Sequence, residues 1–196
     1  VLFRSARIRA DADQLEAEFL GRDARRGERM RRVLRLRHDL EVHLHGNATL
    51  AIADGMIVTV GDQTVVIPLT HVLESLRPEE ADVQHIGKDL MVLNNRGKFL
   101  PIVRLDHSVG ALGAAQTAQD AVLIVVDTES HGQAVLMVDN IVDQRQFVIK
   151  SLEAHYQPVT GVAGATILGD GKVALILDVD SLVADNFAQH GTSLAA

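Results

Sequence analysis

The sequence predicts a mainly β protein built from short strands that alternate with turn signals. From residue 56 onward, nine strand-like apolar runs follow one another at the spacing typical of small barrels or sandwiches. The same order of strand, tight turn, strand and link occurs twice, over residues 56–105 and again over 121–179. Because 47% of the 196 residues are hydrophobic, one domain with a sizeable core is expected.

The first part of the pattern contains four predicted strands, at 56–60, 64–69, 90–93 and 98–105. Their connectors include Gly-Asp-Gln and Asn-Asn-Arg-Gly, which supply the residue types that turns prefer. Pro68 and Pro101 lie inside strand-like runs. Because proline donates no ladder hydrogen bond, we expect their strands to lie at a sheet edge or to be bulged.

A short peripheral helix is predicted over residues 69–76. Leu69, Val72, Leu73 and Leu76 recur at the spacing that places side chains on one face of a helix. Farther along, residues 108–120 are rich in small side chains and are interpreted as the link between the two parts of the pattern.

The second part contains five predicted strands, at 121–127, 133–139, 146–150, 164–168 and 172–179. A closing helix is predicted over residues 178–190. Asp180 or Ser181 is expected to cap it, because short polar side chains accept hydrogen bonds from the first free N–H groups of a helix.

The stretch Gly-Ala-Thr-Ile-Leu-Gly-Asp-Gly-Lys, residues 164–172, suggests either a phosphate-binding loop or a strand turn. A P-loop requires lysine and a hydroxyl residue directly after its second glycine. Asp170 stands where that lysine belongs, and Lys172 comes two positions late. The pair Asp170-Gly171 instead favours a two-residue hairpin turn, and Gly164 is expected to allow a close backbone approach.

Composition excludes several classes of function. The chain has no cysteine, which removes disulfides and thiolate chemistry and suits a cytoplasmic protein. A net charge of −7, with one Tyr and no Trp, argues against nucleic acid as a partner. The sequence shows neither an apolar run long enough to span a bilayer nor a signal peptide, so we expect no insertion into a membrane.

Charge changes abruptly near Asn47. Residues 1–47 hold 11 of the 19 basic residues, all arginine, and 8 of the 26 acidic residues. A basic helix that binds anionic surfaces and an ordinary solvated helix are both compatible with this segment, and its partial apolar stripe favours the second. The asymmetry marks a compositional boundary.

The sequence offers no convergent set of catalytic or metal-binding side chains. His43 and His45 form a closely spaced pair, but no third ligand is evident. Most of the aspartates fall where strands end, which is the usual place for that residue. No serine lies in a Gly-x-Ser-x-Gly elbow. We therefore predict no catalytic residue, no metal and no cofactor, and interpret the chain as a binding module.

Four separated blocks carry a family resemblance. They read GDQTVVIPLTHVLESLRP, VLNNRGKFLPIVRL, AVLMVDNIVDQRQFVIKSL and VAGATILGDGKVALILDVDSL. In this order they resemble the CheW-like regulatory domain found at the C-terminus of CheA-type chemotaxis histidine kinases. The similarity covers about residues 49–182. Ser151 departs from the kinase pattern, in which a proline usually follows the lysine, and only a local change of the loop is expected.

The resemblance implies two SH3-like five-stranded β-barrel subdomains with short peripheral helices. It implies a CheW-like domain over residues 48–188 and a tail over 189–196. Residues 1–47 then have an uncertain status, as an unrelated segment, a remnant or a misread frame. The resemblance also implies docking to a CheW-type adaptor and to the cytoplasmic tip of chemoreceptors, in arrays at the inner face of the membrane.

The parent protein would be a histidine kinase, with ATP-binding and dimerisation domains to which this domain couples. The chain itself lacks catalytic motifs and is not expected to phosphorylate anything alone. A stand-alone adaptor of the CheW type is the alternative, and an enzyme with an unrecognised active site is the third possibility.

The predicted partner-binding residues come from the first half of the pattern. They are Val65, Ile67, Leu90, Val92, Asn94, Arg96, Gly97 and Leu100. The apolar members are equally compatible with a role in the core, and a loss of folding after substitution would reveal that role. Gly164, Asp170 and Gly171 are predicted to serve the turn of the last hairpin.

Overall fold

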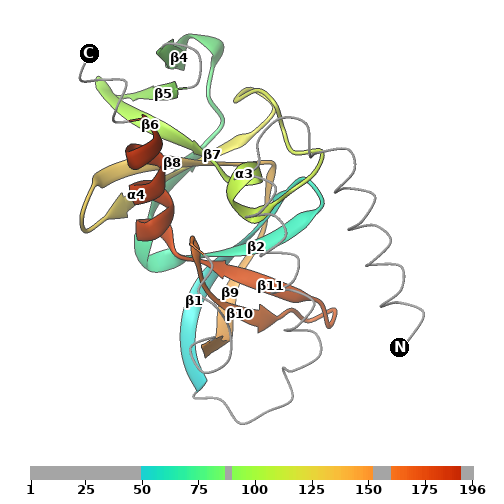
Figure 1. Ribbon diagram of the computed structural model, residues 1–196. Helices are drawn as coiled ribbons and strands as arrows, with labels where there is room; N and C mark the ends of the chain where they lie inside the picture. Colours follow the sequence, from blue (N-terminus) through green and yellow to red (C-terminus); the bar gives the residue numbers. More distant parts are fainter. Residues whose placement is uncertain (1–49, 87–89, 152–159, 191–196) are drawn as a thin grey trace.

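The computed structural model describes residues 50–86, 90–151 and 160–190 (Figure 1). The first part of the described chain contains β1 (Leu50–Val60), β2 (Gln63–Pro68), η1 (Leu69–His71), β3 (Val72–Leu76), η2 (Glu80–Asp82), β4 (Val83–Ile86), β5 (Leu90–Asn95) and β6 (Lys98–Arg104). The second part contains α3 (Leu105–Val109), β7 (Val122–Thr128), β8 (Gly132–Val138), β9 (Asn140–Ser151), β10 (Val162–Ile167), β11 (Val173–Leu177) and α4 (Val179–His190).

The strands form two sheets, which confirms the mainly β architecture. One sheet is a closed barrel in the order β1-β2-β11-β10-β9, and the other has six strands in the order β3-β7-β8-β6-β5-β4. Figure 1 shows the barrel strands in the lower part of the molecule and β4 to β8 in the upper part. The two parts of the sequence pattern do not correspond to the two sheets, because the barrel takes strands from both ends of the described chain.

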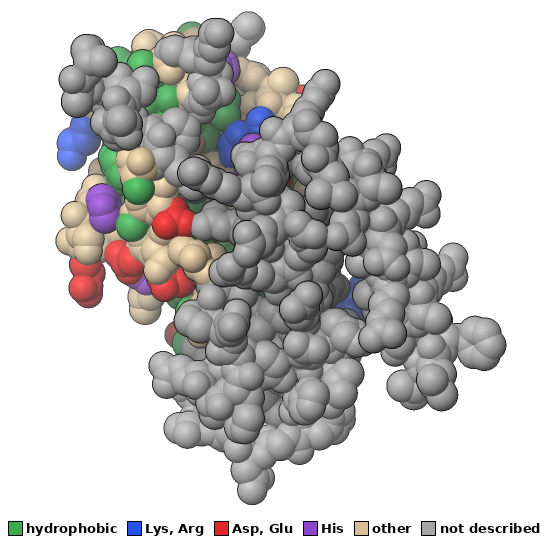
Figure 2. Space-filling view, in the orientation of Figure 1, with side chains coloured by type: hydrophobic (Ala, Val, Ile, Leu, Met, Phe, Trp, Pro, Cys, Tyr) green, Lys and Arg blue, Asp and Glu red, His purple; other side chains and the backbone are tan. Residues whose placement is uncertain are grey.

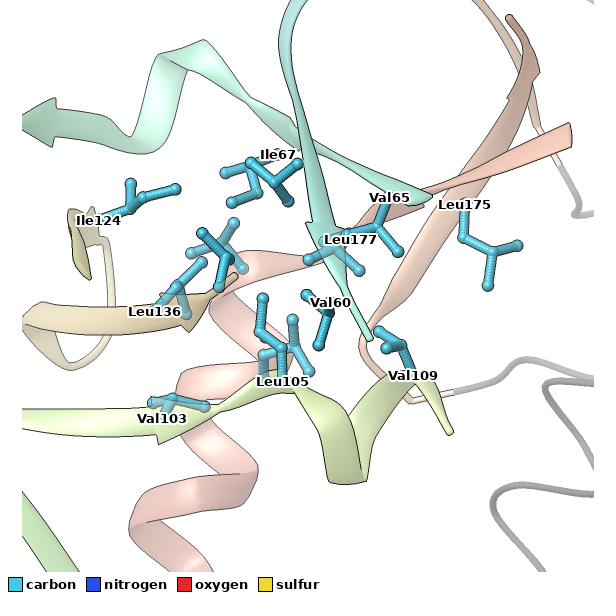
Figure 3. Packing of buried hydrophobic residues seen from close by; sticks show 14 of the residues in the cluster. Val60, Val65, Ile67, Val103, Leu105, Val109, Ile124, Leu136, Leu175 and Leu177 are labelled. Atoms are coloured by element: carbon cyan, nitrogen blue, oxygen red, sulfur yellow. The ribbon is translucent and has the colours of Figure 1, made fainter. Parts of the chain in front are cut away.

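A hydrophobic core shared by both sheets holds them together. Val65 and Ile67 on β2 belong to the same buried cluster as Ile124 on β7 and Leu136 on β8 (Figure 3). Because side chains alternate along a strand, Val66 belongs to a different cluster, formed only by residues of the barrel and its β10–β11 turn. A third cluster lies on the six-stranded sheet and its flanking loop.

The predicted helix over residues 69–76 is wrong. Only Leu69–His71 form a single 3-10 turn, and Val72–Leu76 form β3, which pairs antiparallel with β7. Burial alternates along β3, with Leu73 53% exposed, as expected for a strand with one covered face. Pairing with the buried strand β7 decides the conformation, whereas the local apolar spacing fits a helix equally well.

The two strand prolines have different positions from those expected. Pro68 is the last residue of β2, but β6 is an interior strand that lies between β5 and β8. The missing N–H of Pro101 is tolerated because Pro101 pairs with β5 alone, and the parallel pairing of β6 with β8 begins one residue later, at Ile102. An edge position for this strand is therefore excluded.

The last hairpin has a longer turn than predicted. Leu168 N–H donates to Lys172 O across the turn, so three residues, rather than two, form the loop. Gly171 has a φ of +80°, the left-handed conformation usual for the last residue of a three-residue hairpin loop. Asp170 accepts a hydrogen bond from Lys172 N–H at 3.1 Å. Gly164 lies next to a register irregularity in the β10–β11 pair.

The closing helix is confirmed as α4, but its cap is different. The carboxylate of Asp178 accepts hydrogen bonds from the backbone N–H and the hydroxyl of Ser181, at 3.1 and 2.6 Å. Asp178 is therefore the capping residue. Asp180 instead accepts from Glu129 N–H at 3.0 Å and so ties the first turn of α4 to the β7–β8 turn.

The segment between α3 and β7 crosses the end of the β1–β2 hairpin. Asp62 and Leu112 exchange two hydrogen bonds, of 2.9 and 3.0 Å. The carboxylate of Asp139 accepts from Gly61 N–H at 2.6 Å and from Ala115 N–H at 2.9 Å. Two aspartates therefore fix the predicted linker against the barrel. The predicted segment 1–47, most of the predicted tail 189–196, and the pair His43 and His45 lie outside the described residues.

Candidate protein-docking surface

The β5–β6 hairpin has a tight two-residue turn. Arg96 has a φ of +52° and Gly97 a φ of +83°, and Asn95 pairs with Lys98 directly before and after them. Positive φ at both central positions is the conformation of a type I′ turn, which matches the twist of the strands. Asn94 Oδ1 accepts a hydrogen bond from Gly97 N–H at 3.1 Å, so the predicted residues Asn94, Arg96 and Gly97 together shape the tip.

Glu74 on β3 holds the tip of this hairpin. Its carboxylate accepts from Asn95 Nδ2 at 2.8 Å and from Arg96 Nη2 at 2.9 Å. The Arg96 side chain is 82% exposed, so this ion pair contributes little to the free energy of unfolding. The contact nevertheless joins the edge strand β3 to the β5–β6 turn, although β7 and β8 lie between β3 and β6 in the sheet order.

The outer face of β4, β5 and β6 forms a continuous surface. Residues opposite each other in antiparallel strands share a face. The register therefore places the following residues on the face turned away from the cluster of the six-stranded sheet: Gln84, Ile86, Leu90, Val92, Asn94, Phe99 and Pro101. We call this set the docking surface. Phe99 is 57% exposed and Ile86 is 46% exposed, which makes them its most accessible apolar members.

The structure brings together six of the eight predicted partner-binding residues. Leu90, Val92, Asn94, Arg96, Gly97 and Leu100 all belong to the β5–β6 hairpin. Leu100 faces inward, because it pairs with Leu93 in the cluster of the six-stranded sheet. Val92 is on the outer face but is only 5% exposed.

Val65 and Ile67 are not near the hairpin in the fold. Both lie on β2 in the shared core, and both are at most 1% exposed. Because both side chains are buried in the core, a charged substitution at either position would disrupt the packing directly. Such a variant therefore reports on folding. Any part in docking stays a prediction for these two residues.

Sequence reasoning missed Phe99 and Ile86. The run Lys98–Arg104 alternates, so that Phe99 and Pro101 face one side and Leu100 and Ile102 the other. That alternation was visible in the sequence, but hydrophobicity alone does not say which of the two faces is covered. Ile86 had no signal, because β4 was not among the predicted strands.

A groove of mixed charge adjoins the hairpin tip. It has a volume of about 340 Å³ and is lined by Leu73, Glu74, Asn95, Arg96, Lys98, Val125 and Gln133. A different face is acidic. Figure 2 shows acidic side chains on the side where Figure 1 places α4 and the β7–β8 turn, and Asp180, Asp127 and Glu129 belong to these elements.

Among the described residues, Asp106 is the most deeply buried charged side chain, and Arg104 and His107 contact its carboxylate. Asp106 is 7% exposed, and Arg104 donates to both of its carboxylate oxygens, at 3.3 and 2.8 Å. His107 Nε2 lies 3.3 Å from Asp106 Oδ2. Burial by itself raises the pKa of Asp106, but hydrogen bonds from His107 and Arg104, together with their charges, lower it to about 2. The carboxylate is a permanently ionised structural anchor at neutral pH.

Over the described ranges, no group of three or more His, Asp or Glu side chains is arranged to hold a metal ion. In the same part of the chain, no helix combines the length and the apolar character that crossing a bilayer requires.

Comparison with known proteins places these features in context. Residues 54–187 match the family described as CheW-like domain. The chain is 49% identical over 146 residues to the chemotaxis protein CheA of Rhizobium meliloti, which covers 74% of the chain and 19% of the relative. It is 44% identical over 135 residues to CheA of Cereibacter sphaeroides, covering 69% of the chain and 20% of the relative. The chain thus spans about a fifth of the length of these relatives.

A solved structure shares the fold. The crystal structure of the scaffolding protein TtCheW from Thermoanaerobacter tengcongensis superposes with a TM-score of 0.52. The match covers 67% of this chain and 92% of TtCheW, at 17% sequence identity. At that identity the likeness concerns the arrangement of strands alone.

Proposed function

The chain belongs to the CheW-like domain family, and from this membership we propose that it is the regulatory domain of a chemotaxis histidine kinase, which docks a CheW-type adaptor. The observation that carries the proposal is the identity of 40–49% with CheA proteins over about 70% of the chain. A CheW-type adaptor that acts alone is the alternative. The low identity to TtCheW makes that alternative weaker.

The docking surface is the proposed contact with the adaptor. Phe99 and Ile86 supply exposed apolar area, and Asn94, Arg96 and Gly97 form a polar tip at one end. An apolar centre with a polar rim is the usual composition of a specific protein interface. Val92 is a buried member of this surface, Leu100 packs on the opposite face beneath it, and Leu90 extends it along β5.

The remaining parts of the proposal concern the parent protein. The domain is proposed to sit in the cytoplasm at receptor arrays, to contact the tip of chemoreceptors, and to transmit receptor state to the ATP-binding domain of the kinase. The proposed role of the domain within that kinase is positioning.

Calorimetric titration with a purified CheW-type adaptor tests the docking surface. Phe99→Asp and Ile86→Asp place a charge at the two exposed apolar ends of the docking surface, and we expect each to weaken binding at least tenfold, about 1.4 kcal/mol. Val142→Asp is the matched control, because Val142 on β9 is 59% exposed, close to the value for Phe99. Equal affinities for all three variants would remove the docking surface from the proposal.

A reconstituted array separates the kinase domain from the adaptor alternative. The chain is added to receptor, full-length kinase and limiting adaptor, and kinase activity is measured. A kinase regulatory domain competes for the adaptor and lowers activity. An adaptor instead restores activity when the original adaptor is left out. Restoration would therefore contradict the proposal.

A further inference from the structure

The barrel is closed between β9 and β10 by a short pairing. Among the described residues, the register of these two strands consists of two pairs, Ser151 with Gly164 and Lys150 with Ala165. Over the next residues of β9, Arg145–Val148, the strand remains paired with β1 on its other side. Likewise β10 continues to pair with β11 through Ile167. Within the described chain, the two strands therefore separate while each keeps its outer neighbour.

A groove of about 310 Å³ lies where these two strands separate. It is lined by Arg145, Gln146, Phe147, Val148, Thr166, Ile167, Leu168 and Gly169. One hydrogen bond crosses it, from the Thr166 hydroxyl to Val148 O at 3.1 Å. The volume lies at the lower end of the range for small binding sites and suits a few residues of extended chain.

Backbone groups line both walls of the groove. Val148 O points toward β10, because it accepts from Thr166, and alternation along β9 directs the backbone of Gln146 the same way. On the opposite wall, Leu168 N–H points toward β11, since it donates to Lys172 O, so the neighbouring Ile167 points its backbone groups toward β9. These strand edges form no ladder pairing across the groove among the described residues.

Exposed apolar side chains flank the groove. Val148 is 46% exposed and Ile167 is 47% exposed. Ile52 on β1 pairs directly with Val148 and is 69% exposed. One apolar row therefore crosses three strands on the outer face of the barrel, where an added strand would place its own side chains.

The groove lining carries one charged residue, Arg145. Its Nε donates to Asp143 at 3.0 Å, and its Nη2 also contacts Asp143. Nη1 is the remaining nitrogen, and it is the nearest atom to a Cβ built on Gly169, at 3.5 Å. A cationic donor thus faces the hairpin end of the groove and is complementary to a carboxylate.

We propose that the β9–β10 groove binds an extended segment of a partner protein, by strand addition, with apolar residues at alternate positions and a carboxylate at the end next to Arg145. Beyond the Thr166–Val148 hydrogen bond, the backbone groups of Gln146 and Ile167 form no ladder pairing across the groove and suit a backbone partner. The apolar row receives alternate side chains, and Arg145 Nη1, the nitrogen that Asp143 does not hold, contacts the acidic end. This site lies on the barrel and does not depend on the proposed docking of an adaptor to the six-stranded sheet.

Peptide titration followed by amide NMR of the full chain tests the groove. The probe is the acetylated and amidated peptide Thr-Val-Thr-Val-Thr-Glu. We expect saturable shifts of the Gln146, Val148 and Ile167 amides, with a Kd below about 1 mM. The same peptide ending in lysine should bind at least threefold more weakly, and a version with proline at its two central positions should not bind, because proline cannot pair on both sides.

Variants separate this site from the docking surface. Arg145→Gln should remove the preference for glutamate over lysine, and Ile167→Asp should weaken peptide binding while adaptor binding is unchanged. Phe99→Asp should leave peptide binding unchanged. Absence of saturable shifts at about 5 mM peptide overturns the proposal, as does equal binding of the proline peptide. Shifts of the same amides that grow with protein concentration alone would identify a second copy as the occupant and would also overturn it.

Discussion

At the scale of single residues, the buried carboxylate of Asp106 couples stability to acid. Although burial raises its pKa, hydrogen bonds from His107 and Arg104 outweigh this effect and lower the pKa to about 2, below the ordinary value of an aspartate side chain. A depressed pKa contributes stability above the unfolded value, and this contribution is lost as pH falls from about 4 toward 2. We expect Asp106→Asn to lower the free energy of unfolding by about 2 kcal/mol at pH 7. Urea unfolding at several pH values measures this.

The difference in the free energy of unfolding between wild type and Asp106→Asn is the informative quantity, because other carboxylates also titrate in acid. The gap between wild type and Asp106→Asn should close as pH approaches 2. A gap of the same size at pH 7 and at pH 2 would show that packing, rather than the charge, carries the effect of Asp106.

Gly61 illustrates a backbone position that accepts no side chain. Its φ is +54°, and a Cβ there would lie 2.1 Å from Leu112 O. We expect Gly61→Ala to destabilise the fold by more than about 2 kcal/mol, because strain and a backbone clash add together. Gly113→Ala is the matched control. Gly113 lies next to Leu112 in the segment that crosses the β1–β2 turn and also has a positive φ, of +71°, but no atom lies within 4 Å of its Cβ position. Thermal unfolding should show a smaller loss for the control, and equal losses would refute the clash.

At the scale of secondary structure, β3 shows how a neighbouring strand overrides a local pattern. The apolar spacing in residues 69–76 fits one face of a helix, yet Val72–Leu76 pair with β7, whose residues Val122–Val126 are all buried. A partner strand that is already in the core offers ladder hydrogen bonds and burial together. A short isolated helix offers neither, and helices of this length are marginal in water.

The start of α4 depends on Asp178. Replacing it with alanine removes the acceptor for Ser181 N–H, and we expect a loss of about 0.5–2 kcal/mol in the free energy of unfolding. Asp178→Asn should retain most of that stability, since asparagine caps as well as aspartate does. Chemical unfolding monitored by circular dichroism compares the two. A loss of the same size in both variants would point to the negative charge rather than to the hydrogen bond.

At the scale of the whole molecule, the shared core makes the two sheets one folding unit. Leu136 on β8 is fully buried in the cluster that also contains Val65 and Ile67 of the barrel. We expect Leu136→Ala to cost about 2–5 kcal/mol. Native-state hydrogen exchange should then show the same gain in rate for protected amides of β1 and of β7. A gain confined to the six-stranded sheet would mean that the barrel unfolds independently.

The hairpin that carries the proposed docking surface was predicted in part. The β5–β6 hairpin was expected from its two apolar runs and its Asn-Asn-Arg-Gly connector, and the predicted residues Asn94, Arg96 and Gly97 do form its tip. The exposed members Phe99 and Ile86 were not predicted, because a strand pattern shows that two faces differ without showing which one a second layer covers. The β9–β10 groove had no local signal, since it results from two strands that are distant in sequence and pair only briefly.

The sequence by itself determined the mainly β class, most of the strand runs, the place of the β5–β6 and β10–β11 turns and the closing helix, because these depend on side-chain periodicity and on residues that tolerate turn conformations. Family membership was also present in the order of its motifs. Only the tertiary structure decided that β1 and β2 join β9–β11 in one barrel, that β3 is a strand, and which side chains remain exposed. Those outcomes depend on pairings between distant segments, whose free energy appears only when both partners are in place.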